Sequence, residues 1–350
     1  MNSSALQRAP LPWQREEWAR LRMPIVRGEL HHALLLSGPA GIGKRLLGEL
    51  LGQSLLCRAT DDGAACGHCR DCRLFEAGSH PDLLRVFPEE PGRQIRIEQI
   101  RAGLAEFVMR TASVAQAKVA IIDPADAMNM STANSLLKSL EEPAPRTYIV
   151  LLSDAPARLL PTVRSRCLQL DLRPPSLERA TLWLREACGV EDAADLLGVA
   201  AGMPLLALRL HENNSLPGFD RMLDVMRRAA QPRAWIADLA AEWSDLELLE
   251  LLDWIFLFLV DLSRVLACGD AARARIPRAA ATHAELLPVL GGSQVAHALR
   301  RVVEARRDAT STANPNPQLL LEALLFDWHS TCSASGLGSS PHIGSLWQAG

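Results

Sequence analysis

A glycine-rich loop lies near the start of the chain, at residues 38–45, which read Gly-Pro-Ala-Gly-Ile-Gly-Lys-Arg. This is the G-x-x-x-x-G-K frame of a phosphate-binding loop without its final hydroxyl residue. Glycines let successive backbone N–H groups turn toward one anion, and the helix that follows adds the positive end of its dipole. The sequence therefore predicts a nucleotide loop formed by Gly38, Gly41, Gly43 and Lys44.

Two positions of this nucleotide site have the wrong chemistry for hydrolysis. Arg45 stands where Ser or Thr would hold Mg²⁺, and a guanidinium cannot ligate a metal. Asp123 ends an apolar run, as a Mg²⁺-binding carboxylate does, but Pro124 follows where a Glu would orient the attacking water. Asp126 is a poor substitute because it lies three residues further on. We expect a degenerate site that does not hydrolyse ATP, and the sequence leaves open whether Lys44 still binds ATP or ADP.

Four cysteines follow the loop at metal-ligand spacing: Cys57, Cys66, Cys69 and Cys72. Two x₂ spacings and one longer arm fit a closed tetrahedral Zn²⁺ site of four thiolates, which is structural rather than catalytic. His68 lies inside this cluster and could replace one thiol, although four cysteines are enough. Residues 1–8 lack the apolar core of a signal peptide, so we expect a cytoplasmic protein with reduced thiols rather than disulfides.

An arginine-containing turn, Arg164-Ser165-Arg166-Cys167, stands just before the strand-like residues 168–170. Arginine is suited to neutralising the charge on a γ-phosphoryl group, often one that a neighbouring subunit holds. A surface arginine in an ion pair is the better interpretation of this stretch alone.

The elements that must position these residues follow two patterns. Up to residue 173, continuous apolar runs alternate with helical spacing, which predicts an α/β domain with a parallel sheet covered on both faces. The clearest buried strands are residues 32–37, 118–123 and 148–153.

Beyond Pro174-Pro175 only helical periodicity remains. We expect a small helical lid over 174–212, an all-helical domain over 213–328 and a disordered tail, rich in Ser and Gly, over 329–350.

Composition limits the function classes. Hydrophobic residues make up 48% of the chain and charged residues 22%, as in a soluble globular protein. The formal net charge is −3, so any contact with DNA should be local or shared with partners. The longest apolar run, residues 254–260, is too short to span a bilayer and is better interpreted as a buried helix face.

Together these motifs resemble the AAA+ clamp-loader subunits of bacterial DNA polymerase III. The resemblance covers roughly residues 10–330 and combines the glycine loop, the cysteine cluster and four further segments. These segments are Ser79-His80-Pro81-Asp82, residues 134–143 (Asn-Ser-Leu-Leu-Lys-Ser-Leu-Glu-Glu-Pro), Ser165-Arg166-Cys167 and residues 314–322.

The chain departs from the motor subunits of that family, the gamma/tau class, at three positions. By resemblance, a motor subunit has Thr at position 45, Glu at position 124 and an arginine on the lid helix, where this chain has Leu205. Three catalytic positions fail while Ser165-Arg166-Cys167 is present. The resemblance therefore implies a subunit that does not hydrolyse ATP and whose Arg166 acts as an arginine finger in a neighbour's site.

The resemblance also implies architecture and partners. It implies a RecA-like AAA+ domain with an inserted zinc module at 57–72, a helical lid and an all-α collar domain for oligomerisation. The expected partners are the delta and gamma/tau subunits, the beta sliding clamp and primer-template DNA. We expect this chain itself to be neither polymerase nor ATPase. An active AAA+ motor of the gamma/tau kind is the alternative, and a zinc-ribbon nucleic-acid module is a third hypothesis.

Overall fold

The computed structural model describes residues 9–90, 92–310 and 315–334. It divides into two compact units, residues 1–191 with 202–206 and residues 192–201 with 207–350. The N-terminal octapeptide, Asn314 and the expected tail beyond residue 334 lie outside the described residues.

The first unit is built on a five-stranded sheet in the order β2-β3-β4-β1-β5. All pairs of neighbouring strands are parallel, as predicted. The strands are β1 (Ala33–Ser37), β2 (Leu83–Val86), β3 (Lys118–Ile122), β4 (Thr147–Ser153) and β5 (Leu168–Asp171). Three of them, β1, β3 and β4, fall on the predicted buried runs. The edge strand β2 did not stand out in the sequence, because only its last residue is buried.

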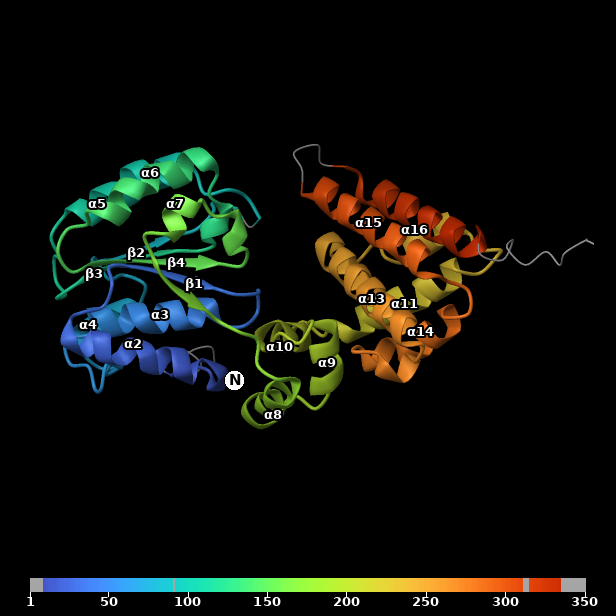
Figure 1. Cartoon of the computed structure of the whole chain (residues 1–350), viewed down its shortest axis with the longest axis horizontal. Coiled ribbons are helices and arrows are strands. Elements are labelled where there is room, and N and C mark those ends of the chain that lie inside the picture. The colour runs from blue at the N-terminus through green and yellow to red at the C-terminus, as the bar shows by residue number, and fades with distance from the viewer. Residues whose placement is uncertain (1–8, 91, 311–314, 335–350) are drawn as a thin grey trace, which may run out of the picture. The chain divides into compact units, whose positions relative to one another are not determined.

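Helices cover both faces of the sheet (Figure 1). One face carries α2 (Arg15–Arg27), α3 (Lys44–Leu56) and α4 (Arg70–Glu76). The other carries the π-helical turn η2 (Gln99–Leu104), α5 (Ala105–Met109), α6 (Met130–Glu141) and α7 (Pro161–Arg164). Alternate residues of each strand point to opposite layers. In β1, Leu34 belongs to the same buried cluster as Leu47 of α3, whereas Leu35 belongs to the cluster that contains Leu136 of α6. The predicted α/β class is confirmed.

The rest of the described chain contains only helices and the segments that connect them, as expected beyond Pro174-Pro175. Helix α8 (Leu177–Cys188) belongs to the first unit, and α10 (Pro204–Glu212) passes from the first unit to the second. The other helices of the second unit are α9 (Ala193–Val199), α11 (Leu216–Ala229), α12 (Ile236–Ala241), α13 (Leu248–Cys268), α14 (Ala280–Leu286), α15 (Gly292–Ala309) and α16 (Pro317–Ala334).

The helices that we expected to form a lid over 174–212 are shared between the two units. In the second unit, Arg278 lies 3.4 Å from Asp195 of α9 and 2.6 Å from Asp220 of α11. These ion pairs and the close approach of Gly198 to the Arg275 carbonyl hold α9 to the rest of the second unit.

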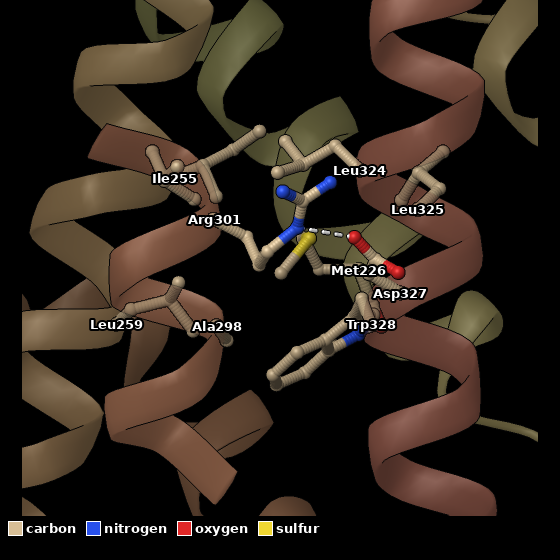
Figure 2. Close-up of a pocket in the computed structure, with 10 residues that line it drawn as sticks. Met226, Ile255, Leu259, Ala298, Arg301, Leu324, Leu325, Asp327 and Trp328 are labelled. Carbon is tan, nitrogen blue, oxygen red and sulfur yellow. Dashed lines mark hydrogen bonds and ion pairs between the residues drawn. The ribbon is translucent and has the colours of Figure 1, made fainter. Parts of the chain in front are cut away.

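The core of the second unit contains the apolar run at 254–260, which lies in α13 with Trp254, Ile255 and Phe258 buried. Figure 2 shows a small cavity in this core, lined mainly by apolar side chains and one ion pair, Arg301–Asp327 at 2.5 Å. None of the described helices is by itself long and apolar enough to cross a bilayer, although α9 and α10, bent by 108°, meet that test as a pair.

Helix α16 continues past residue 328, where we expected the disordered tail to begin. The prediction was wrong for residues 329–334, because tertiary contacts hold this end of the helix. Trp328 Nε1 donates to the Met226 carbonyl (2.9 Å), His329 Nδ1 lies 2.9 Å from the Ala229 carbonyl, and Cys332 is buried.

A buried carboxylate holds the loop that leads into β3. Asp82, in the Ser-His-Pro-Asp segment, accepts backbone N–H groups of Ser113 (2.6 Å), Val114 (2.7 Å) and Ala115 (2.8 Å). Burial by itself would raise the pKa of Asp82, but the three N–H donors outweigh it and hold the pKa below its usual range. Ionised Asp82 therefore stabilises the folded state.

We expect Asp82→Asn to lower the free energy of unfolding at pH 7 by about 1–3 kcal/mol, because an amide turns one of its donors toward backbone donors. Since the folded pKa lies below the unfolded one, the contribution of Asp82 is complete above about pH 4 and is lost as the pH falls through the folded value. Urea unfolding from pH 7 to pH 3 should show the difference between the two proteins shrinking. Exposed Asp171→Asn is the control, and equal losses in both variants would contradict the assignment.

Candidate functional sites: a glycine loop, an arginine turn and a cysteine cluster

The glycine loop connects β1 to α3, as predicted, and needs its glycines. Gly38, Gly41 and Gly43 have φ angles of 144°, 82° and 93°, which other residues rarely adopt. A Cβ on Gly38 would lie 2.4 Å from the Leu172 carbonyl oxygen, and one on Gly43 would lie 2.5 Å from a Leu11 methyl group. The phosphate-loop conformation is therefore built into the sequence.

The chain's own residues fix the carbonyls of this loop. In the 3₁₀ turn η1 (Pro12–Gln14), Trp13 Nε1 donates to the Ile42 carbonyl (2.9 Å) and Gln14 Nε2 donates to the Gly43 carbonyl (2.9 Å). The Leu205 N–H donates to the Gly41 carbonyl (3.0 Å). Leu205, which the resemblance led us to expect at the position of the motor subunits' lid arginine, thus contacts the loop through its backbone and offers it no charge.

Lys44 at the start of α3 is paired with acceptors of the same chain. Its side chain is only 7% exposed, and its Nζ donates to the Pro39 carbonyl (2.8 Å) and forms an ion pair with Asp154. Asp154 follows the end of β4. In this structure its carboxylate gives Lys44 the negative partner that a nucleotide phosphate gives the lysine of a working loop.

Arg45 is paired in the corresponding way with Asp123. Its Nε lies 2.5 Å from Asp123 Oδ2, and its guanidinium lies over the Phe87 ring at 4.8 Å from the centroid. The guanidinium thus provides the positive charge that Mg²⁺ provides next to this carboxylate in an active ATPase. Asp126, the substitute base, accepts the Ser153 hydroxyl (2.6 Å) and the Asp154 N–H (3.0 Å), so it anchors the end of β4.

The arginine turn is shaped by the residues on either side of Arg166. The Ser165 hydroxyl donates to the Thr162 carbonyl (3.2 Å) and the Cys167 thiol donates to the Val163 carbonyl (3.3 Å). These bonds satisfy carbonyls at the end of α7. Burial raises the pKa of Cys167 to about 11, so it remains a neutral thiol that can donate.

Arg166 itself is 36% exposed and forms an ion pair with Glu141, the last residue of α6. The structure does not bring Arg166 to its own glycine loop. Because β1 and β5 are parallel, the loop after Ser37 lies at the carboxyl edge of the sheet and Arg166, before Leu168, lies at the amino edge. The three residue steps from Leu168 to Asp171 of β5, at about 3.3 Å each, separate the two edges by about 10 Å. Gly38, Gly41, Gly43, Lys44 and Asp123 do come together at the carboxyl edge.

The four cysteines form one cluster between α3 and α4. Their sulfurs all lie within 4.8 Å of one another, with Cys57–Cys69 and Cys66–Cys72 separated by 3.9 Å. Tetrahedral Zn²⁺ with bonds of about 2.3 Å requires sulfurs about 3.8 Å apart, so the donor set fits. Backbone N–H groups of Cys66, Cys69 and Cys72 point at the preceding sulfurs at 3.3–3.4 Å. The cluster could hold a metal ion and is compatible with zinc.

The thiols of this cluster are in different surroundings. Burial raises the pKa of Cys57 and of Cys72, whereas the backbone N–H of His68 lowers the pKa of Cys66 to about 7. A bound cation would stabilise all of them as thiolates. His68 is exposed, and its Nδ1 lies 2.8 Å from the Cys66 carbonyl, as expected for a residue outside the ligand set.

Two carboxylates of these sites were missed by the sequence analysis. Asp154 follows β4 as Asp123 follows β3, and that parallel was its signal. Glu141 stands in the Leu-Glu-Glu-Pro segment that carried the resemblance, but nothing in the sequence indicated that it contacts Arg166.

Comparison with known proteins finds matches over both units. A family described as "DNA polymerase III, delta subunit" matches residues 13–176, and one described as "DNA polymerase III, delta subunit, C terminal" matches residues 220–330. DNA polymerase III subunit delta′ of Pseudomonas aeruginosa is 36% identical over 322 residues, which cover 91% of this chain and 97% of that protein. The Escherichia coli subunit delta′ is 32% identical over 318 residues, 90% of this chain and 94% of its own length.

The likeness to subunit tau covers a shorter part of the chain. DNA polymerase III subunit tau of Escherichia coli is 33% identical over 167 residues, which cover 48% of this chain and 25% of tau. Among the clamp-loader subunits, the motifs of the sequence resembled delta′ in particular, and the relatives confirm that choice. The chain belongs to the delta′ family of DNA polymerase III clamp-loader subunits.

Proposed function

We propose that this chain is a non-hydrolysing clamp-loader subunit that assembles with delta and gamma/tau subunits to load the beta sliding clamp onto primed DNA. One observation carries the proposal: the degenerate nucleotide loop and the arginine turn lie at opposite edges of one sheet. Arg166 cannot serve the loop of its own chain and is free to serve that of a neighbour.

The loop's own groups support the absence of hydrolysis. Arg45 takes the place of the Mg²⁺-binding hydroxyl and neutralises Asp123, while Pro124 offers no carboxylate for water. A nucleotide would also have to compete with Asp154 for Lys44. The retained residues Gly38–Lys44 still allow ATP or ADP to bind without being hydrolysed.

Arg166 acts in this proposal as an arginine finger on ATP held by an adjacent gamma/tau subunit. Its partly exposed guanidinium would stabilise charge on the transferring γ-phosphoryl group. The helical second unit would be the collar through which subunits assemble. With a net charge of −3, this chain would contact primer-template DNA as part of the complex.

The cysteine cluster is proposed to hold a structural Zn²⁺ with Cys57, Cys66, Cys69 and Cys72 as ligands. Four protein ligands leave no open position for substrate, and the cluster joins the end of α3 to α4. A cytoplasmic location, where thiols stay reduced, suits this role.

An active AAA+ motor of the gamma/tau kind is the second candidate, favoured by the likeness to tau and by the retained Lys44 and Asp123. The purified chain separates the two. We expect no Mg²⁺-dependent ATP turnover above background for the isolated chain, in a coupled assay with a gamma/tau subunit as positive control. Turnover at the rate of that control would establish the motor.

We expect Arg166→Ala to lower the kcat of ATP hydrolysis by the reconstituted, DNA-stimulated complex by about 10³-fold at the catalytic site that it serves. Other sites in the complex would dilute this loss, so single-turnover measurement is the suitable assay. Exposed Arg158→Ala, on the η4 turn (Pro156–Arg158), is the matched control. If the Arg166→Ala variant assembles normally and hydrolyses ATP at an unchanged rate, Arg166 is not an arginine finger.

We expect elemental analysis of the purified chain to give one zinc per molecule and Cys66→Ser to lose it. Hydrogen exchange should then rise over residues 57–76, because the metal holds that segment. Exposed Cys268→Ser should keep the metal. Wild-type protein purified without chelator that contains no metal would contradict the zinc proposal.

A further inference from the structure

Among the residues that the structure describes, one carboxylate and one backbone carbonyl orient the Arg166 guanidinium. Arg166 Nε donates to Glu141 Oε1 at 2.8 Å, and Nη2 lies 2.5 Å from the same oxygen. Nη1 donates to the Thr162 carbonyl at 2.9 Å. One edge of the guanidinium is therefore engaged by Glu141, and the turn before it fixes the plane of the group.

These three bonds leave part of the guanidinium available. Arginine has five N–H donors, one on Nε and two on each terminal nitrogen. Within the described part of the chain, the bonds found for Arg166 engage one donor on each of its three nitrogens. One N–H on Nη1 and one on Nη2 remain, and such a pair can donate to phosphoryl oxygens.

Glu141 is itself placed by a rigid element. It ends α6, whose Leu136 and Leu140 are buried against the sheet. The Asn129 side chain caps the start of this helix by accepting the Thr132 N–H (2.9 Å). Near its other end, the Leu140 carbonyl lies 2.7 Å from His32 Nε2, just before β1. The backbone that carries the Glu141 carboxylate is thus fixed relative to the sheet.

We propose that Glu141 is a positioning residue for Arg166. It holds the Nε edge of the guanidinium so that the free N–H groups of Nη1 and Nη2 are presented, already oriented, to the γ-phosphoryl group in the neighbouring subunit. The inference rests on the proposed role of Arg166. A free arginine would lose side-chain entropy on reaching the phosphate, and an oriented one has lost it beforehand.

The opposite role for Glu141, a lock that keeps Arg166 away from phosphate, fits the contacts less well. A lock would bind the pair of terminal N–H groups that a phosphate needs, whereas the contacts among the described residues leave one N–H on each terminal nitrogen of Arg166. The two roles also predict opposite changes in rate when the carboxylate is removed, so an experiment separates them.

The test uses the complex reconstituted with delta, gamma/tau, beta clamp and primed DNA, and measures kcat and KM for ATP. We expect Glu141→Ala to lower kcat between about 10- and 100-fold, the range for a misplaced catalytic group, with KM for ATP unchanged. Glu141→Gln keeps an oxygen that accepts from Nε and Nη2, and it should restore most of the rate. In an Arg166→Ala background, Glu141→Ala should have no further effect, because Glu141 acts through that arginine.

Glu142→Ala is the matched control, since Glu142 is the neighbouring exposed carboxylate. Thermal unfolding and co-purification with the partner subunits show whether each variant folds and assembles, and Glu141→Gln keeps the test valid should the alanine variant fail. A higher kcat for Glu141→Ala, an unchanged kcat, an equal loss in Glu142→Ala or a further loss in the Arg166→Ala background would each overturn the positioning role. If Arg166→Ala itself leaves hydrolysis unchanged, the proposed role of Arg166 as an arginine finger is wrong. The positioning role of Glu141, which depends on it, is then wrong as well.

Discussion

Parallel pairing of β1 with β5 is the constraint on which the rest of the arrangement depends. In a parallel sheet every strand begins at one edge and ends at the other. The glycine loop follows the end of β1, and the arginine turn precedes the start of β5, so two sites that are neighbours in strand order are separated by the length of a strand. A subunit built this way carries the glycine loop at one edge of the sheet and, at the opposite edge, the arginine that we propose serves a neighbouring molecule.

Ion pairs within the chain explain how the glycine loop can fold although its residues do not support ATP hydrolysis. A nearly buried ammonium such as that of Lys44 is unfavourable unless a carboxylate or a phosphate pairs with it. Asp154 forms that pair, and Arg45 does the same for Asp123. Each group that a nucleotide and its metal would neutralise has a partner within the chain. The loop therefore needs no bound nucleotide or metal to balance these charges. Its glycines are required for its backbone conformation whether or not it binds a ligand.

The same principle of fixing a polar side chain from several directions recurs away from the loop. Asp82 accepts three backbone N–H groups and so holds the chain where it enters β3. Arg166 is held by Glu141 and by the Thr162 carbonyl at the surface. In both cases several polar partners hold one charged group: three backbone N–H groups for Asp82, and one carboxylate and one backbone carbonyl for Arg166. The difference is exposure: Asp82 is buried and structural, whereas Arg166 keeps part of its guanidinium accessible.

The sequence by itself determined the α/β class, the glycine loop and the cysteine cluster. It also showed that Arg45 and Pro124 lack the groups that ATP hydrolysis requires. These follow from residue type and local spacing, which act over a few residues. The tertiary structure alone decided which groups meet. Nothing in the sequence pairs Lys44 with Asp154 or Arg166 with Glu141, because those contacts depend on how strands far apart in the chain are ordered in the sheet. Helix α16 likewise ends later in the chain than predicted. Its contacts with α11, and not the local Ser and Gly content, keep residues 329–334 helical.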